Sequence, residues 1–195
     1  MTLHVVCVAY HKPIALRGLV DSFMLQTNSD WRLHILHDGP APASVLQTAS
    51  LYAGDSHVAF ECTPERYGNY GHPNRRRGLE QIVAPITDFV LITNDDNYYV
   101  PVFVEKMLAV CTPRVGMAYC NTVHSYMNYD VMYTRLKECY IDMESFIVRL
   151  DVAQAVGFRH NHHSADGAYA VECAQYCMTQ HLEVKYVDKP YFIHN

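Results

Sequence analysis

Residues 89–101 read FVLITNDDNYYVP, and this stretch indicates how the rest of the chain folds. Its first five residues form an apolar run, which is typical of a central strand in a parallel sheet. Residues 94–97, Asn-Asp-Asp-Asn, follow this run directly. Ligands of open α/β sheets bind outside the carboxyl ends of the strands. The segment that follows the run is therefore a candidate binding site.

Strand-like and helix-like segments alternate on the N-terminal side of this stretch. Apolar runs at 3–9, 31–36 and 57–61 predict strands. Apolar residues spaced three and four apart at 16–24 predict a helix, and a second helix is expected at 74–83. Such alternation predicts an α/β fold with a mostly parallel, Rossmann-like central sheet flanked by helices.

The C-terminal half is less regular, although it contains no repeat, low-complexity tract or linker. Its patterns predict strands at 116–121, 146–150 and 184–187 and helices at 101–111, 152–156 and 167–180. A chain of 195 residues is most simply one domain. We therefore expect residues 1–195 to form a single domain, either alone or within a longer protein.

The composition excludes several classes of protein. Half of the residues are hydrophobic, so a sizeable core can be buried. The net charge of -5 argues against a nucleic-acid binder that works by broad phosphate neutralisation. The seven cysteines form no CxxC pair, which favours reduced thiols in a cytoplasmic protein. The sequence shows neither a signal peptide nor a transmembrane segment.

Asp95 and Asp96 form the sharpest candidate site. Two adjacent carboxylates repel each other, and a divalent cation would relieve that repulsion. Oxygen ligands suit Mg²⁺ or Mn²⁺, either of which can also bridge phosphate oxygens. The alternative is a solvated turn, because Asn and Asp are frequent in turns.

A second candidate is the segment 66–78, RYGNYGHPNRRRG. Its glycines allow the backbone to approach a ligand closely, and its arginines can donate paired hydrogen bonds to phosphate. The alternative is a mobile surface loop before a charged helix. Asp38, in the turn HDGP, could bind ribose hydroxyls or a base edge, but turn chemistry alone would also explain it.

Further candidates lie near the C-terminus. Asp166 could serve as a general base or simply cap a helix. His160, His162 and His163 form a weak zinc candidate, since no partner has ligand spacing. His194 could be a metal ligand or part of a frayed terminus.

Five segments, taken in order, resemble the GT-A glycosyltransferases, in particular the large inverting family that includes bacterial polysaccharide and capsule transferases. The similarity spans about residues 3–172, nearly the whole chain. The ordered set is more specific than any one segment. The segments are AYHKPIALRGLVDSFMLQTNSDWRLHILHDGP, ERYGNYGHPNRRRG, FVLITNDDNYYVP, SFIVRLDVAQAVGF and SADGAYAVE.

The resemblance implies a role for each matched residue. Asp96 would bind Mn²⁺ or Mg²⁺, with Asp95 beside it on the metal or the ribose, and His194 is our third candidate ligand. The cation would hold the diphosphate of a nucleotide-sugar donor, with a UDP-sugar favoured. Asp166 would deprotonate a hydroxyl of a carbohydrate acceptor, and the anomeric configuration would invert. The expected donor contacts are Ala9, Tyr10, His11, Asp38, Arg66, Arg75 and Asp95.

Four residues depart from the pattern of this family: His37 and Asn94 stand where it has Asp, Arg76 stands where it has Asn, and Ala165 stands where it has Glu. They leave open a second interpretation, a catalytically silent module that binds a nucleotide or sugar. A nucleotidyltransferase is disfavoured, because the first loop lacks the Gly-rich basic sequence such an enzyme needs. The tyrosine-rich segment 126–140 is expected either to form the acceptor side or to supply ordinary core aromatics.

Overall fold

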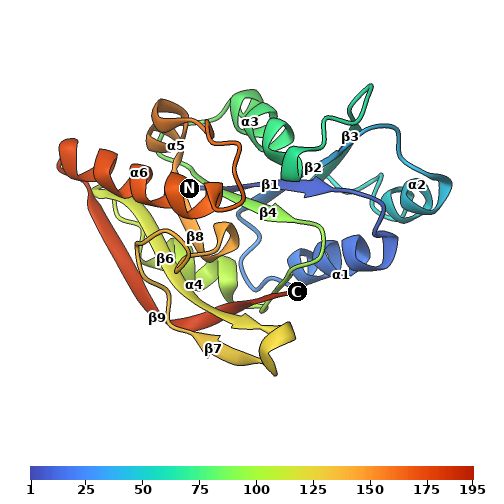
Figure 1. The fold of residues 1–195 in the computed structure, drawn as a ribbon. Coiled ribbons are helices and arrows are strands. Elements are labelled where there is room, and N and C mark those ends of the chain that lie inside the picture. The colour runs from blue at the N-terminus through green and yellow to red at the C-terminus, as the bar shows by residue number, and fades with distance from the viewer.

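The computed structural model describes residues 1–195, which form one nine-stranded sheet with helices on both faces (Figure 1). The strand order is β3-β2-β1-β4-β8-β6-β9-β5, and β7 pairs with β6. No helix is both long enough and apolar enough to cross a membrane. The strands are β1 (Leu3–Ala9), β2 (Trp31–His37), β3 (Val58–Cys62), β4 (Phe89–Asn94), β5 (Tyr98–Tyr99), β6 (Val115–His124), β7 (Asp130–Met132), β8 (Phe146–Arg149) and β9 (Glu183–His194). The α-helices are α1 (Pro13–Met24), α2 (Ala43–Ser50), α3 (His72–Gln81), α4 (Phe103–Ala109), α5 (Leu150–Val156) and α6 (Ala165–Thr179), and three short 3₁₀ turns are η1 (Asn69–Gly71), η2 (Ser125–Met127) and η3 (Met143–Ser145).

The first four strands along this order, β3, β2, β1 and β4, are parallel to one another. Their register aligns Ala9 of β1 with His37 of β2, and Val8 of β1 with Asn94 of β4. The carboxyl ends of β1, β2 and β4 therefore meet at one edge of the sheet, as the sequence predicts.

The other half of the sheet is mixed. β8 runs antiparallel to both β4 and β6, whereas β9 runs parallel to β6. The sequence predicted only residues 184–187 as the last strand, but β9 continues to His194. Irregular pairing between Cys120 and Thr122 of β6 accommodates the Asp-Lys-Pro segment of β9, after which Phe192 pairs with Tyr99 of β5. Hydrogen bonds to β6 and β5 thus keep β9 a strand beyond the Asp-Lys-Pro segment, where local strand propensity is low.

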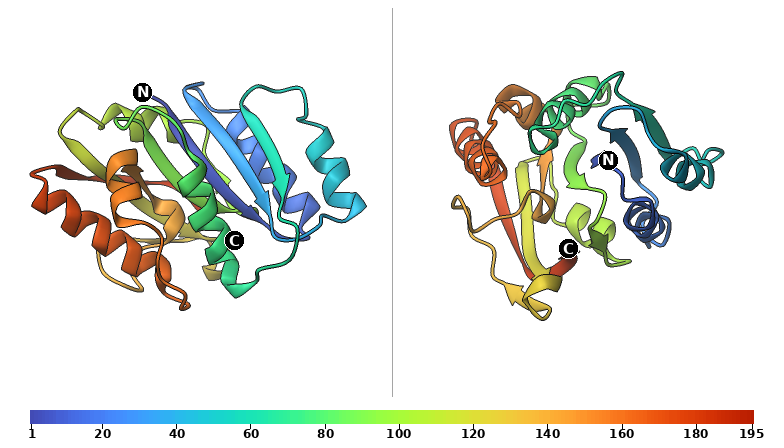
Figure 2. Two further views of the ribbon diagram at one scale, coloured as in Figure 1. Left: turned by 90° about the horizontal axis from the view of Figure 1, so that it is seen from above. Right: turned by 45° about the vertical axis from the view of Figure 1, so that its right-hand side comes forward.

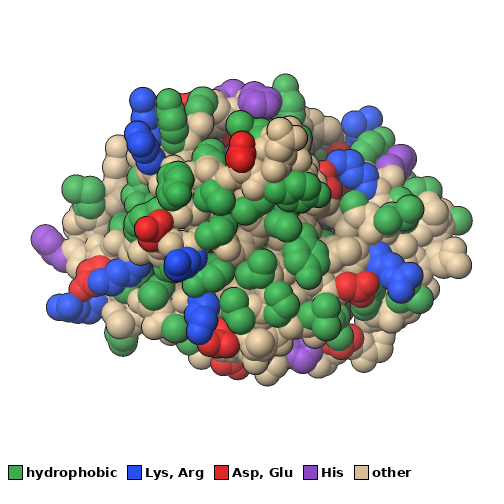
Figure 3. All heavy atoms as spheres, turned by 90° about the horizontal axis from the view of Figure 1, so that it is seen from below, with side chains coloured by type: hydrophobic (Ala, Val, Ile, Leu, Met, Phe, Trp, Pro, Cys, Tyr) green, Lys and Arg blue, Asp and Glu red, His purple; other side chains and the backbone are tan.

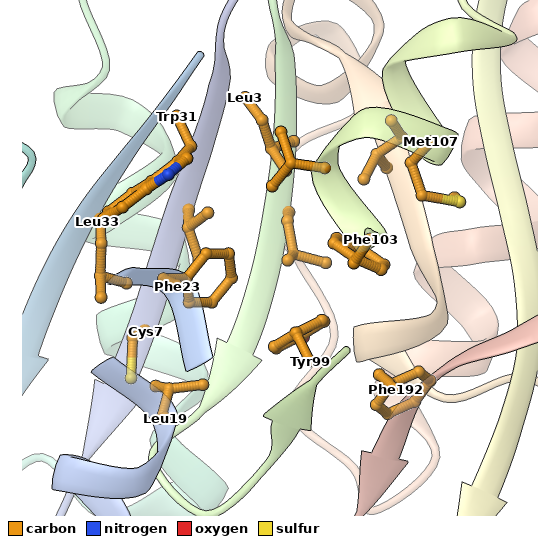
Figure 4. Packing of buried hydrophobic residues seen from close by; sticks show 14 of the residues in the cluster. Leu3, Cys7, Leu19, Phe23, Trp31, Leu33, Tyr99, Phe103, Met107 and Phe192 are labelled. Atoms are coloured by element: carbon orange, nitrogen blue, oxygen red, sulfur yellow. The ribbon is translucent and has the colours of Figure 1, made fainter. Parts of the chain in front are cut away.

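Two apolar clusters lie on opposite faces of the sheet. Alternation along β1 sends Leu3, Val5 and Cys7 into the first cluster and Val6 into the second. Figure 4 shows the first cluster, where Phe23 of α1 and Phe103 of α4 pack between the helices and the sheet. Residues of α3, α5 and α6 make up much of the second. Two further views show the helices covering both faces (Figure 2).

The arginine-rich helix α3 lies unusually close to the sheet. A Cβ added to Gly78 would lie 2.4 Å from Cγ1 of Val6 and 2.9 Å from Cδ1 of Leu36, so only glycine fits there without rearrangement. At the start of the same helix, Gly71 has a φ of 78°, and its added Cβ would lie 2.6 Å from Val8. These contacts hold the segment 66–78 against the end of β1.

Candidate functional site

A pocket of about 300 Å³ opens at the carboxyl edge of the parallel strands. Four parts of the chain form it: the ends of β1 and β4, the turn after β2, and the loop before α3. Six of the residues expected from the sequence line this pocket: Ala9, Tyr10, Asp38, Arg66, Asp95 and Asp96. The others are Val8, Lys12, Gly68, Asn69, Tyr70, Gly71 and Asn94.

Asp38 fixes the glycine-containing loop at one wall of the pocket. It is 5% exposed, and its Oδ1 accepts hydrogen bonds from the Tyr67 amide at 2.8 Å and from Asn74 Nδ2 at 3.1 Å. Its Oδ2 accepts one from the Gly68 amide at 2.9 Å. Bonds to a charged acceptor are stronger than neutral ones. Asp38 therefore shapes the loop and still lines the pocket.

Arg66 covers the rim of the pocket. Its guanidinium carbon lies 4.2 Å from the ring centroid of Tyr10, and its Nε lies 3.9 Å from Oδ2 of Asp38. The side chain of Arg66 is 61% exposed. An exposed guanidinium stacked on an aromatic ring is available to an anionic ligand. His11, also expected at the site, is exposed and stacks on Tyr10 with ring centroids 4.0 Å apart, but does not line the pocket.

His37, which stands where the family pattern has Asp, is a structural bridge. Its Nδ1 lies 2.7 Å from the carbonyl oxygen of Gly39, so Nδ1 donates, and Nε2 accepts the His11 amide at 3.4 Å. One ring thus joins the turn after β2 to the loop after β1. An aspartate there could not donate to the Gly39 carbonyl, which explains why the replacement is compatible with this turn.

Asp95 and Asp96 lie side by side at the end of β4, but their surroundings differ. Oδ2 of Asp95 accepts the Tyr10 amide at 2.9 Å, and burial, with the Asp96 charge adding to it, raises the pKa of Asp95 to about 6. Asp96 is partly exposed and accepts Lys12 Nζ at 2.6 Å, a hydrogen bond that raises the pKa of Lys12.

This carboxylate pair fits a divalent cation. The ammonium of Lys12 already places a positive charge against Asp96, and burial of Asp95 beside a second carboxylate penalises its ionised form. A divalent cation bound in place of the Lys12 ammonium would neutralise both carboxylates. The donors are oxygen atoms, which suit Mn²⁺ and Mg²⁺.

Arg75 lies beneath the pocket and does not line it. Its Nη1 donates to the Tyr70 carbonyl at 2.8 Å and to His72 Nδ1 at 2.7 Å, while Nη2 donates to Asn94 Oδ1 at 2.7 Å. Burial lowers the pKa of Arg75, whereas the charge of Glu144 raises it. Arg75 was expected near the nucleotide; the structure shows it bracing the loop and the end of β4.

Asn94 explains a second departure from the family pattern. It accepts from Arg75, and its Nδ2 donates to Oε1 of Glu144 at 3.0 Å. Glu144 is 1% exposed, and burial followed by the charges of Asp142 and Asp166 raises its pKa to about 8. The amide at position 94 both accepts from Arg75 and donates to Glu144, whereas a carboxylate there could only accept. Glu144 was not among the residues expected at the site, because no local sequence pattern marks it.

Asp166 is the second residue of α6, whose N-cap position is taken by Ser164. It is therefore not the N-cap that the alternative interpretation suggested. Burial raises the pKa of Asp166, while the positive charge of Arg75 lowers it. Asp166 forms no hydrogen bond with another side chain and does not line the pocket of about 300 Å³. Its charge acts on both Arg75 and Glu144, so it faces the same buried network.

His194 does not line the pocket either. It lies at the end of β9, paired with His124 of β6, so it is not part of a frayed terminus. Its side chain lies with those of His124 and Asp142, two residues not expected from the sequence, in a group whose possible ligand atoms lie within 4.8 Å of one another. The structure contains no other group of three or more potential ligands; in particular, His160 pairs with Glu172 at 2.8 Å instead.

The tyrosine-rich segment 126–140 is not a source of core aromatics. Tyr126, Tyr129 and Tyr133 are 63%, 64% and 66% exposed. The segment includes β7, which lies at the lower edge of the molecule in Figure 1. Figure 3 views the molecule from that side, and hydrophobic side chains spread across the face it shows. The segment is therefore free to contact other molecules.

Comparison with known proteins gives structural relatives but no sequence relatives. No protein-family profile and no curated protein matches the sequence. Residues 1–349 of TarS from S. aureus superpose with a TM-score of 0.77 at 13% identity, covering 100% of this chain and 60% of theirs. The same part of TarS in complex with UDP-GlcNAc gives 0.78 at 14%, covering 100% and 58%.

A third similar structure is the mannosyltransferase PcManGT from Pyrobaculum calidifontis in complex with GDP-Man and Mn²⁺. It has a TM-score of 0.70 at 12% identity, with 98% of this chain and 56% of that chain covered. The chain thus spans less than two thirds of each of these solved chains, and 37% of the longer solved chain of TarS. The fold expected from the sequence is confirmed: this chain has the α/β fold of GT-A nucleotide-sugar glycosyltransferases.

Proposed function

We propose that this chain is a glycosyltransferase domain that moves a sugar from a nucleoside diphosphate sugar, with UDP-sugars favoured, to a hydroxyl of a carbohydrate acceptor. The observation that carries the proposal is the pocket at the strand ends. It unites Asp38, Arg66, Asp95 and Asp96, which are far apart in sequence, at the edge where α/β sheets bind ligands. TarS and PcManGT, whose folds are similar, have been solved with UDP-GlcNAc and GDP-Man.

The two walls of the pocket suit different parts of such a donor. Asp38 and the loop that it holds would contact the base and ribose, with Ala9 and Tyr10 beside them. Arg66 would reach the diphosphate from the rim, where a flexible guanidinium can form paired hydrogen bonds with phosphate oxygens. Lys12 would move from Asp96 toward the same negative charge.

Asp96 and Asp95 would hold Mn²⁺ or Mg²⁺ in this account, and His194 is not needed for that site. Bound there, the cation would neutralise charge on the diphosphate. Arg75 acts from below as a positioning residue, because its bond to Asn94 fixes the end of β4 from which both carboxylates project.

Asp166 is our candidate for the general base. A carboxylate with a raised pKa is a better proton acceptor near neutral pH than an ordinary one. As the acceptor oxygen attacks the anomeric carbon, Asp166 takes its proton and the bond from that carbon to the diphosphate oxygen breaks. Attack from the opposite face inverts the configuration. The exposed segment 126–140 would supply aromatic rings for the acceptor to stack on.

The alternative function is a catalytically silent module that binds a nucleotide or sugar on the same fold. It is favoured by one observation, that Asp166 does not line the pocket. The domain is expected to act in the cytoplasm, because all seven cysteines are free and five of them are buried.

Turnover separates the two functions. We would measure release of UDP from UDP-GlcNAc and of GDP from GDP-mannose, with Mn²⁺ and a panel of oligosaccharide acceptors. Asp166→Asn should lower the rate about 10²–10⁴-fold, the usual contribution of a general base, with donor affinity changed little. Asp96→Asn should lower both rate and affinity. A wild-type chain that binds either donor but never releases the nucleoside diphosphate would instead be the silent module.

A further inference from the structure

We propose that Glu144 is a positioning residue, which holds the carboxyl end of β4 through the side chain of Asn94. The end of β4 leads directly into Asp95 and Asp96. The inference rests on the proposed function, because it takes these two aspartates as the cation site. Glu144 does not line the pocket at the strand ends, here called the donor pocket, whereas Asn94 does. Its effect on a bound cation is therefore exerted through Asn94.

The sheet brings Glu144 to Asn94 from a distant part of the chain. β8 pairs antiparallel with β4, and Val148 lies opposite Val90. The same register, continued four residues along each segment, sets Glu144 opposite Asn94. There Nδ2 of Asn94 donates to Oε1 of Glu144 at 3.0 Å. Side chains that lie opposite each other on paired strands are the ones that interact. The contact therefore follows from the pairing of β8 with β4.

The turn that carries Glu144 is fixed within the protein. All three residues of η3 are buried, and the turn packs against β4. The backbone amide and the hydroxyl of Ser145 both donate to the carbonyl oxygen of Asp142, at 3.0 and 2.7 Å. A side chain whose rotamer is restricted by packing can hold a neighbouring group in one position. Glu144 meets this condition, so it can serve as a fixed acceptor for Asn94.

Asn94 is held from two sides. Nη2 of Arg75 donates to its Oδ1 at 2.7 Å, and Glu144 accepts from its Nδ2. Arg75 and Glu144 are 6% and 1% exposed, so neither has bulk water as an easy substitute. Turning the amide over would set donor against donor at Arg75 and acceptor against acceptor at Glu144. The two bonds together therefore fix the orientation of Asn94.

Loss of the acceptor at position 144 should be felt at the aspartates. Asn94 would then be held by Arg75 alone, and the end of β4 would be less well defined. Partners that orient metal ligands contribute about 10–100-fold to metal affinity or activity. Glu144 acts through one intervening residue, so we expect the lower end of that range, about tenfold.

The test uses Mn²⁺ alone, without any donor. The full chain is titrated with MnCl₂ and followed by calorimetry and by the paramagnetic resonance signal of free Mn²⁺. Glu144→Met removes the acceptor and keeps an unbranched side chain, so it should weaken Mn²⁺ binding about tenfold. Glu144→Gln keeps an oxygen that can accept from Asn94, and it should recover most of this loss. Urea unfolding establishes that each variant is folded.

Two further variants show whether the effect passes through Asn94. In an Asn94→Ala background, Glu144→Met should weaken Mn²⁺ binding no further, because the bond between them is already absent. Ile147→Val is the matched control: Ile147 lies three residues further on and belongs to the first apolar cluster. It should lower the stability to urea and leave Mn²⁺ affinity unchanged.

The outcomes separate this inference from the proposed function. Unchanged Mn²⁺ affinity in a folded Glu144→Met chain would overturn the inference alone, as would an equal loss in the Asn94→Ala background. If Glu144→Met does not fold, Glu144→Asp decides: it draws the carboxylate back from Asn94 and should weaken Mn²⁺ binding about two- to tenfold, the range of one hydrogen bond. A wild-type chain that binds no Mn²⁺ would overturn both, because the aspartates would then hold no cation.

Discussion

His72 should make the stability of this chain sensitive to mild acid. Its ring is 2% exposed, Nε2 donates to the His162 carbonyl at 3.1 Å, and Nδ1 accepts from Arg75. Burial, followed by the positive charge of Arg75, lowers the pKa of His72 from 6.5 to about 4. Protonation would place two cations 2.7 Å apart and break the bond that orients Arg75.

The sign and size of the effect follow from proton linkage. As the pH falls below 6.5, the unfolded chain takes up a proton on this histidine before the folded chain does, so stability is lost. Between pH 7.5 and pH 5 this one group should lower the free energy of unfolding by about 2 kcal/mol. His72→Asn keeps an acceptor for Arg75 but cannot be protonated.

Urea unfolding at half-unit steps from pH 7.5 to pH 5 would measure this difference. Wild type should lose about 2 kcal/mol more than His72→Asn over the range, and the other histidines cancel in the comparison. Parallel curves for the two proteins would refute the reasoning, because they would mean that His72 is protonated equally in the folded and unfolded chains.

Three further predictions concern packing and the donor pocket. Gly78→Ala should lower the free energy of unfolding by about 1–3 kcal/mol, because the added Cβ would clash with Val6. Gly18→Ala should raise the free energy of unfolding by about 0.5–1 kcal/mol, because Gly18 lies in the exposed middle of α1 with nothing within 4 Å of the added Cβ. Thermal unfolding of the two variants would check both values. In the absence of donor, the Lys12→Met variant should bind Mn²⁺ up to about fivefold more tightly than wild type, because the cation no longer has to displace an ion pair worth at most about 1 kcal/mol. Unchanged or weaker Mn²⁺ binding in calorimetry would mean that Lys12 does not compete with the cation. Arg66→Met should weaken binding of UDP-GlcNAc without altering urea unfolding, because its guanidinium is exposed; a loss of stability instead would assign Arg66 a structural role.

The parallel half of the fold could be predicted from the sequence because local sequence patterns determine its strands and helices. Apolar runs such as 89–93 and helical spacing such as 16–24 are properties of neighbouring residues. The end of β9 is different: it is a strand because β6 and β5 supply its hydrogen bonds across the sheet. Such pairing depends on tertiary contacts, which the local pattern around Pro190 does not reveal.

The residues of the candidate site also fall into two groups: those predictable from local sequence and those placed by tertiary contacts. Residues that follow predicted strands, such as Asp38, Asp95 and Asp96, do line the pocket. Arg75 matched the family motif, but its buried position was not predictable, because the contacts of α3 with β1 decide it. The cluster with His194 could not be found from sequence, since a bulged pairing of β6 with β9 sets its register.

The central claim is that Asp95 and Asp96 hold a cation that carries a nucleotide diphosphate. Calorimetry of UDP-GlcNAc and GDP-mannose binding, with Mn²⁺ and with chelator, tests it most directly. We predict that Mn²⁺ strengthens binding of one of these donors at least about tenfold in wild type, a gain of about 1.4 kcal/mol, and that Asp96→Asn abolishes the gain. Equal affinity with and without Mn²⁺ in the wild-type chain would contradict the account.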